Sequence, residues 1–291
     1  MLFLVFNTII LLRNYLVLKR EFMYKVIVNA DDLGMTPGTN SAIFKGFDEG
    51  YITHTSIMAN ADYFDDAIEG LDDRKELGVG MHLNLTFGKS LHFNTLYNNA
   101  EGVFHLSYLK LLFLSYNKVF LKSIEQEFEK QIMRVLDKGI KLTHIDSHRH
   151  IHLIPGIYHV VIKLARKYNI SRVRLINENI FDSLSLSQRY NFILNGGVIK
   201  YLLLRTFSVI NRKHADLYKN IKFYSILYTG VVTHDIIRKI NQLNEEYEIM
   251  IHPGINILDK NVFFYDNKGE KAYRLSKDRE DELNTVLSTD N

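Results

Sequence analysis

The sequence predicts an α/β protein with a barrel-like (β/α) fold of parallel strands, and three observations support this prediction. Short β-branched or apolar runs alternate with segments of helical periodicity, which is typical of a parallel sheet wrapped by helices. No Pro/Gly/Ser-rich linker and no internal repeat interrupts this alternation. Histidines and carboxylates recur at or just beyond the predicted strand ends, where the functional loops of such folds gather.

Length and composition narrow the class of protein. A chain of 291 residues suits one large α/β domain or two small ones, and the lack of a linker favours one. A net charge of +3 and the lack of a basic run with interleaved aromatics argue against a nucleic-acid partner. The chain has no cysteine, so a metal site must use His, Asp or Glu, and the absence of disulfides suits a cytoplasmic protein.

Residues 1–22 stand apart from the domain that we expect over residues 23–291. The nearly apolar run Met1–Leu12 is shorter than the roughly 17–25 residues of a membrane-spanning helix, and it lacks the marks of a signal peptide. Three interpretations are open: an interfacial membrane anchor, an internal packing helix, or an artefact of an upstream start codon. We favour the last, because Met23 leads directly into the first predicted strand.

The first third of the chain contains three predicted strands and two predicted helices. We expect strands over residues 25–29, 54–60 and 78–85, and helices over residues 40–50 and 65–71. In the third strand, apolar residues alternate with His82, Asn84 and Thr86, so these polar side chains share one face. Residues 87–120 are rich in Asn, Tyr and Phe, and we expect a loop and a short helix over the site. Their aromatic residues are core, lid or a platform for a sugar.

The remainder of the chain continues the alternation. We expect helices over residues 123–138, 157–168, 184–215 (with a break at Gly196-Gly197) and 234–243, a polar helix from 278, and strands over residues 142–146, 172–175, 221–228 and 248–251. In the helix over 123–138, Ile124, Phe128, Ile132 and Val135 lie on one face, which predicts that this face is buried.

The densest chemical signal is the decapeptide Thr143–His152, which holds four histidines and an aspartate. Neutral imidazole is the commonest metal ligand in proteins, so a metal role is expected for at least one of these histidines. His144, Asp146, His148, His150 and His152 share one parity, so on an extended chain all would face the site. Only one or two can bind the metal, and the others orient ligands or bind substrate.

The pair Asp31-Asp32 has two interpretations. Paired acids after a strand often cap the next helix. Alternatively, one carboxylate binds a cation and the other takes a proton from water. Neighbouring strand residues point to opposite faces, so both can reach one site only where the chain turns, and Gly34 and Pro37-Gly38 supply that turn.

Three further residues are weaker candidates. His82 lies on the polar face of its strand beside Asn84, although a lone histidine is more often a core or surface residue. His252 follows an apolar strand and would suit a general acid, with a plain turn as the alternative. Arg174 is either an ordinary surface arginine or the partner that holds Asp31 as a carboxylate. The sequence contains no P-loop, dinucleotide fingerprint or G-x-S-x-G elbow.

Four motifs in this order resemble the YdjC family of carbohydrate deacetylases. They are Asn29–Gly34, Gly80–Thr86, Thr143–His152 and His252–Gly254. The resemblance implies a barrel-like fold related to polysaccharide deacetylases, and one divalent metal ion, Mg²⁺ with Zn²⁺ as the alternative. Leu33 and Arg149 depart from the usual family residues, and neither is a proposed ligand position.

The resemblance also implies a role for each matching residue. Asp32, His82 and His148 would bind the metal ion, Asp31 would be the catalytic base, and His252 would be the acid. The expected reaction is removal of an N-acetyl group from an acetylated amino sugar, an oligosaccharide or a sugar-bearing lipid.

Two alternative functions are kept. A metal-dependent phosphoesterase would use a two-metal site with more of His144, His150 and His152, and a non-catalytic metal- or sugar-binding module would lack a base or an acid. We expect a small acetylated sugar as the partner, no nucleic acid, and membrane contact only through residues 1–22. The sequence leaves the oligomeric state open, with a homodimer as one option.

Overall fold

A computed structural model of the chain describes residues 26–187, 197–213, 217, 221–243, 245–265 and 267–287. The predicted extension over residues 1–22, Met23 and the predicted helix break at Gly196 lie outside the described residues. None of the helices within the described ranges is long and apolar enough to cross a membrane.

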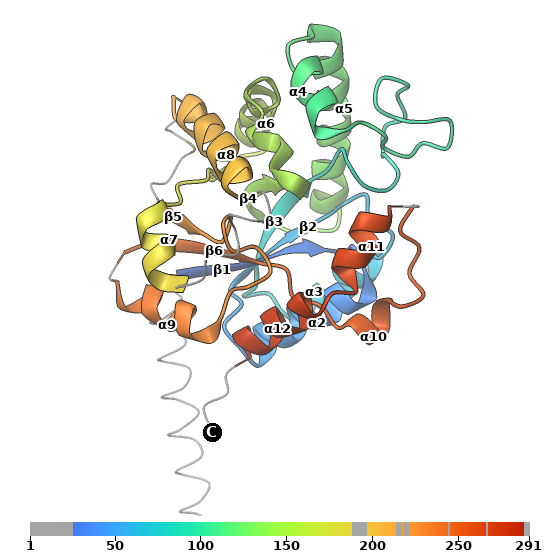
Figure 1. Cartoon of the computed structure of the whole chain (residues 1–291). Coiled ribbons are helices and arrows are strands. Elements are labelled where there is room, and N and C mark those ends of the chain that lie inside the picture. Colours follow the sequence, from blue (N-terminus) through green and yellow to red (C-terminus); the bar gives the residue numbers. More distant parts are fainter. Residues whose placement is uncertain are drawn as a thin grey trace, which may run out of the picture.

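Six parallel strands form one curled sheet, a half-barrel with helices around it (Figure 1). The strands are β1 (Val26–Leu33), β2 (His54–Ile57), β3 (Gly78–Leu83), β4 (Leu142–Ser147), β5 (Lys222–Tyr224) and β6 (Tyr247–Ile251). Their order in the sheet is β4-β3-β2-β1-β6-β5, and every neighbouring pair is parallel. The predicted barrel-like parallel α/β fold is therefore confirmed.

The predicted strand over residues 172–175 is wrong as a regular strand. Val173 makes a single parallel bridge with Ile145 on β4, and beyond it Phe223 on β5 donates from its backbone N–H to the carbonyl of Asn177 at 3.3 Å. The backbone N–H of Ile176 goes instead to the hydroxyl of Ser208 at 2.9 Å. This segment runs from one edge strand, β4, to the other, β5, so it cannot form a continuous ladder of hydrogen bonds with either strand. It links the two edges of the half-barrel.

The helices of the described chain surround the sheet. They are α2 (Pro37–Asp48), α3 (Phe64–Leu71), α4 (Tyr108–Leu114), α5 (Lys118–Leu136), α6 (Pro155–Lys167), α7 (Ile180–Ser187), α8 (Gly197–Asn211), α9 (His234–Gln242), α10 (Asn256–Asp259), α11 (Lys268–Arg274) and α12 (Lys277–Val286), with a 3₁₀ segment η1 (His148–Leu153). Of these, α4, α8 and α11 also contribute residues to a cavity at the carboxyl ends of the strands. The expected apolar face of α5 is buried throughout. The expected loop and short helix over 87–120 contain α4. The sequence did not predict α10 or α11.

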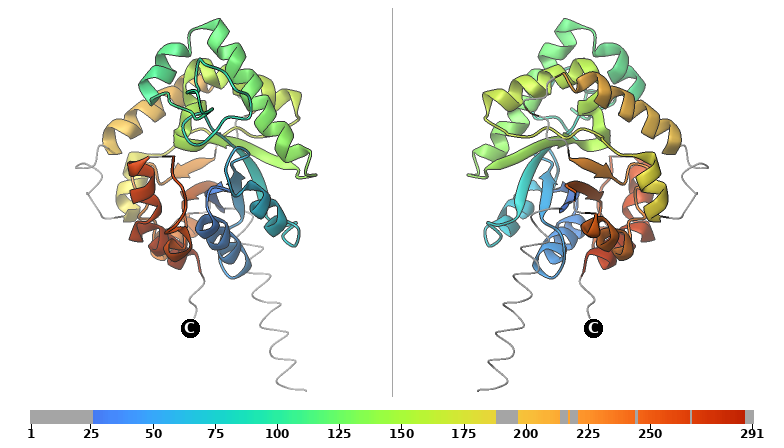
Figure 2. Two further views of the ribbon diagram at one scale, coloured as in Figure 1. Left: turned by 90° about the vertical axis from the view of Figure 1, so that its right-hand side faces the viewer. Right: turned by 90° about the vertical axis from the view of Figure 1, so that its left-hand side faces the viewer.

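The two ends of the described chain meet on the outside of β1. Figure 2 shows the blue helices of the first third beside the red helices of the last. The backbone N–H of Tyr51 donates to Val286 at 2.9 Å, and the backbone N–H of Ile255 donates to Gly38 at 3.2 Å. Contacts between segments more than 200 residues apart thus hold the C-terminal helices against the start of the sheet.

Candidate active site

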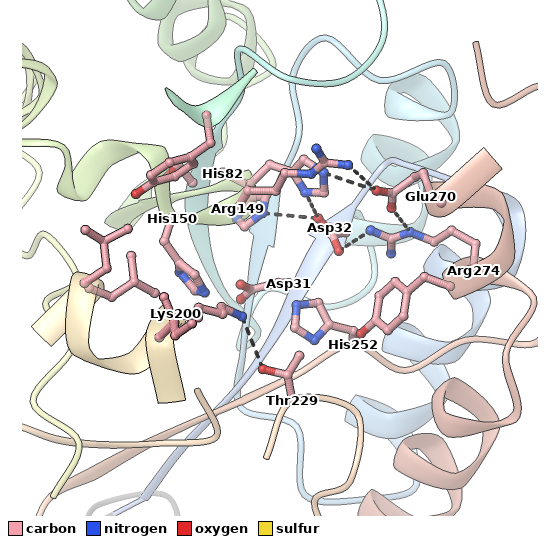
Figure 3. Close-up of a pocket in the computed structure, with 18 residues that line it drawn as sticks. Asp31, Asp32, His82, Arg149, His150, Lys200, Thr229, His252, Glu270 and Arg274 are labelled. Atoms are coloured by element: carbon pink, nitrogen blue, oxygen red, sulfur yellow. Dashed lines mark hydrogen bonds and ion pairs between the residues drawn. The ribbon is translucent and has the colours of Figure 1, made fainter. Parts of the chain in front are cut away.

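The candidate residues gather at the carboxyl ends of the strands, on the floor of one cavity (Figure 3). Asp31 and Asp32 come from the end of β1, and His82 comes from the end of β3. His148 follows β4 directly, and His252 follows β6. Because the sheet is parallel and curled, the ends of these strands converge.

Both neighbouring aspartates reach this floor because β1 is irregular at Asp32. The pairing register of β1 with β2 shifts between Ala30 and Leu33, and Asp32 has a left-handed backbone with φ of 74°. Asp and Asn adopt this conformation more readily than most residues. The structure therefore places the irregularity at the aspartate itself, whereas the sequence suggested that Gly34 and the residues after it supplied the turn.

Asp32 lies between the two imidazoles. Its Oδ1 is 3.2 Å from His82 Nε2 and 3.0 Å from His148 Nδ1, and one ligand atom from each of the three residues lies within 4.8 Å of the others. All three side chains are buried. Burial raises the pKa of Asp32, but the charge of Arg274 and the imidazole of His148 outweigh it and hold that pKa well below its usual value.

The imidazole of His82 is fixed from its far side. Asp146 Oδ1 lies 2.7 Å from His82 Nδ1. Burial alone would lower the pKa of His82, but the nearby carboxylates, with Asp146 the strongest, raise it to about 10. At neutral pH the ring is therefore protonated on both nitrogens. A cation bound at Nε2, which faces Asp32, would displace the Nε2 proton and leave the Nδ1 proton directed at Asp146, the arrangement seen when a carboxylate orients a metal-binding histidine.

Arg174 lies at the centre of a buried group of carboxylates. Its guanidinium donates two hydrogen bonds of 2.8 Å to Asp31 and also contacts Asp146 at 2.6 Å and Glu248 at 2.7 Å. Burial raises the pKa of Asp31, and the charge of Arg174 opposes that rise. Burial alone would also raise the pKa of Glu248, but the charges of Arg172 and Arg174 lower it to about 2.

Two residues of the site, Glu270 and Arg274, were missed by the sequence analysis. Arg274 donates from Nη2 to Asp32 Oδ2 at 2.7 Å and from Nε to Glu270 Oε1 at 2.6 Å. Glu270 Oε2 lies 3.7 Å from His148 Nε2. Their only sequence signal was an acid and a base four residues apart, which surface helices also carry.

Two of the three remaining histidines of the decapeptide, His144 and His152, do not line the cavity. β4 ends at Ser147, and the left-handed backbone of Arg149 and His150 sends the chain into η1. His144 contacts the hydroxyls of Thr143 and Ser56, and His152 contacts Ser147 and the carbonyl of Arg174. Of these three histidines, His150 lines the cavity.

His252 is half-buried on the opposite wall. Its backbone N–H donates to Glu282 at 2.7 Å. Its ring packs edge-to-face against Tyr273, with 6.0 Å between the two ring centroids. Among the described residues its Nδ1 has no hydrogen-bond partner. Burial lowers the pKa of His252 well below its usual value, so the resting ring is neutral.

The cavity has a volume of about 620 Å³, within the range of small-molecule sites. Its floor is polar and its walls are partly apolar. Besides the residues already described and Ser147 and Arg149 of the decapeptide, the cavity is lined by Tyr108, Ile199, Lys200, Leu203, Leu204, Thr229, Gly269 and Tyr273. Tyr108 belongs to the aromatic segment 87–120 that was expected over the site. No motif marked the others, because they come from helices and loops far apart in the sequence.

A half-barrel with a buried carboxylate–imidazole centre at the carboxyl ends of its strands defines an α/β-barrel enzyme. The chain belongs to the YdjC family, because the family model described as YdjC-like protein matches residues 25–290.

Known proteins agree with this assignment. A carbohydrate deacetylase of Listeria monocytogenes (serotype 4b, strain CLIP80459) is 37% identical over 236 residues, covering 79% of this chain and 81% of the relative. One from Clostridium beijerinckii is 35% identical over 170 residues, or 57% of this chain and 67% of the relative. A crystal structure from Enterococcus faecalis V583, described as a candidate cellobiose-phosphate cleavage protein, superposes with a TM-score of 0.63 at 23% identity and 91% coverage of both chains, which supports the fold.

Proposed function

We propose that this protein is a carbohydrate deacetylase that removes the N-acetyl group from an acetylated amino sugar with the help of one divalent cation. The sugar is free, part of an oligosaccharide or attached to a lipid. The observation that carries the proposal is the convergence of Asp32, His82 and His148 beside Asp31 on the cavity floor. The curated relatives named carbohydrate deacetylases support the same activity.

The donor set suits a cation. Asp32 offers Oδ1 toward both imidazoles, and Asp146 leaves His82 Nε2 available. Three protein ligands leave further positions open, as a catalytic site requires. The family likeness implies Mg²⁺, while two imidazoles also suit Zn²⁺. When bound, the cation supplies positive charge that polarises the acetyl carbonyl and favours deprotonation of water.

The reaction we propose is hydrolysis of the amide bond. Asp31, which is not one of the three metal ligands, accepts a proton from the water that attacks the acetyl carbon. Arg174 keeps the carboxylate of Asp31 in place through its two hydrogen bonds. His252, neutral at rest, takes up one proton from solvent and gives it to the sugar nitrogen as the C–N bond breaks, and the proton accepted by Asp31 is returned to solvent. The products are acetate and the free amine.

The geometry argues against the two-metal phosphoesterase alternative. A second group, Asp31, His82 and Asp146, also has its donor atoms within 4.8 Å, but it shares His82 with the first. The guanidinium of Arg174 already contacts both of its carboxylates. A second metal ion bound by this group would be repelled by the positive charge of Arg174. The presence of Asp31 and His252 beside the first group likewise argues against a binding module without catalysis.

The experiment is acetate release from N-acetylglucosamine oligomers and from related acetylated glycolipids. The protein is first stripped of metal with a chelator and then supplied with Mg²⁺ or Zn²⁺. We expect release that depends on the added cation, with one cation bound per chain. No release from any of these substrates with either cation would contradict the proposal, and two cations per chain would favour the phosphoesterase.

A further inference from the structure

Each imidazole of the proposed metal centre faces a carboxylate on the side away from Asp32, His82 within hydrogen-bond distance and His148 just beyond it. His82 turns Nδ1 toward Asp146 at 2.7 Å, and His148 turns Nε2 toward Glu270 at 3.7 Å. From this geometry we infer that Glu270 is a positioning residue, which sets the tautomer and orientation of His148 so that its Nδ1 can bind the cation. The inference rests on the metal centre of the proposed function.

Glu270 is itself held in a fixed position. It is buried at the start of α11, where its backbone N–H donates to the side chain of Asn267 at 2.9 Å. Arg274 donates to its Oε1 at 2.6 Å, and Arg149 reaches its Oε2 at 3.3 Å. The carboxylate therefore has one oxygen fixed by Arg274, and its other oxygen lies between Arg149 and His148.

The chemistry of a carboxylate explains why this position matters. An ionised carboxylate only accepts hydrogen bonds, so it favours a proton on the ring nitrogen that faces it. A proton on Nε2 of His148 leaves the lone pair on Nδ1, and Nδ1 is the atom that lies 3.0 Å from Asp32 Oδ1. Among the described residues Nε2 has no closer hydrogen-bond partner, so a small approach to Glu270 would satisfy it. Such contacts are often long in the unliganded enzyme and shorten on binding.

Arg274 ties this support to the aspartate ligand. One guanidinium holds Glu270 Oε1 and Asp32 Oδ2, and so leaves Asp32 Oδ1 on the side of the imidazoles. The spacing between Asp32 and His148 is thus set from α11, a helix more than 100 residues beyond His148. This makes the C-terminal segment part of the proposed metal centre.

The test is the Glu270→Gln variant, with affinities for Zn²⁺ and Mg²⁺ measured by calorimetry on metal-free protein. A glutamine keeps its oxygen toward Arg274 and presents an N–H to His148, which favours the wrong tautomer. We expect about 10–100-fold weaker cation binding, together with a changed visible spectrum of the Co²⁺-loaded protein. The control is Asp281→Asn, which removes an exposed carboxylate on α12 paired with Lys277. It should bind like the wild type.

His148→Ala, measured alongside, separates failure of this inference from failure of the proposed function. If the wild type binds a cation, His148→Ala does not, and Glu270→Gln binds within twofold of the wild type with an unchanged Co²⁺ spectrum, Glu270 has no positioning role. If the wild type itself binds no divalent cation, the proposed metal centre fails and the inference with it.

A second variant covers the case in which Glu270→Gln does not fold. Glu270→Ala opens space beside His148 on the cavity wall, where added formate can supply the missing carboxylate. We expect formate to restore cation affinity to Glu270→Ala by at least fivefold and to leave the wild type unchanged. Failure of formate to strengthen binding to this variant would contradict a role through the carboxylate.

Discussion

His82 and Asp146 are register partners on the parallel strands β3 and β4, and their side chains meet at 2.7 Å. The pairing of backbone strands thus places a carboxylate behind the imidazole of His82. Since strand pairing sets this contact, its geometry does not depend on a flexible loop.

Asp146→Asn should weaken cation binding by about 10–100-fold. Arg174 and Ser56 donate to Asp146 Oδ2, so an asparagine would keep its oxygen there and turn its N–H toward His82 Nδ1, which disfavours the proton on that nitrogen. Calorimetric titration with Zn²⁺ and Mg²⁺ measures the effect. Asp235→Asn, a surface carboxylate paired with Lys239, is the control. Equal affinity in Asp146→Asn and the wild type would show that His82 does not need this partner.

Asp31→Asn should keep cation binding and lose turnover by about 10²–10⁴-fold, because the amide cannot accept a proton from water. Acetate release and cation affinity measured on the same preparation separate the two effects. Full turnover in this variant would exclude Asp31 as the base, whereas loss of cation binding would show that it helps to hold the cation.

Arg174→Met should reduce the free energy of unfolding by about 3–5 kcal/mol, because it leaves buried carboxylates without their shared cation. These are Asp31, Asp146 and Glu248. Urea denaturation at neutral pH measures the change. Arg238→Met, which removes a surface partner of Asp235, should change stability by less than about 1 kcal/mol. An equally small change in Arg174→Met would mean that the carboxylates are protonated or hydrated.

Glu178→Gln should change how stability depends on pH. Glu178 is fully buried, and burial raises its pKa from 4.5 to about 7. Between these values the folded protein binds more protons at this group than the unfolded chain does, so stability falls as pH rises through the window. A glutamine at this position does not titrate, so the Glu178→Gln variant does not show this fall in stability. The glutamine can still accept from the backbone N–H of Ile226 and donate to Ser183, two of the partners of Glu178.

The stability of Glu178→Gln relative to the wild type should therefore rise between pH 4.5 and 7 and stay constant above pH 7. The total rise should be about 3 kcal/mol. Urea denaturation at a series of pH values measures it. A difference that does not vary with pH would mean that Glu178 titrates alike in the folded and unfolded protein.

The alternation of strands and helices along the chain, and the end of the sheet that carries the site, could be predicted from the sequence. Period-two and helical patterns are local, and in a parallel sheet every strand presents its carboxyl end at the same edge. This is why Asp32, His82 and His148, separated by up to 116 residues, could be expected at one place. It is also why the neighbouring acids and the late His252 were candidates.

Other features could not be predicted, because they depend on contacts across the fold. The extended segment around Val173 looks like a strand locally, but it must link β4 to β5 and so keeps only one bridge. In the decapeptide, every second side chain faces the same side only while the chain is extended. This holds as far as Ser147, where the chain turns into η1.

The sequence by itself determined the strand-end clustering of the candidate ligands and the family of the protein, because both are written in short local motifs. Only the tertiary structure decided that Arg174 neutralises the carboxylates around Asp31, and that Glu270 and Arg274 reach the site from the C-terminal segment. The physical reason is that charge pairing acts through distance in space. A buried carboxylate is stabilised by whichever cation the fold brings within reach, wherever that cation lies along the chain.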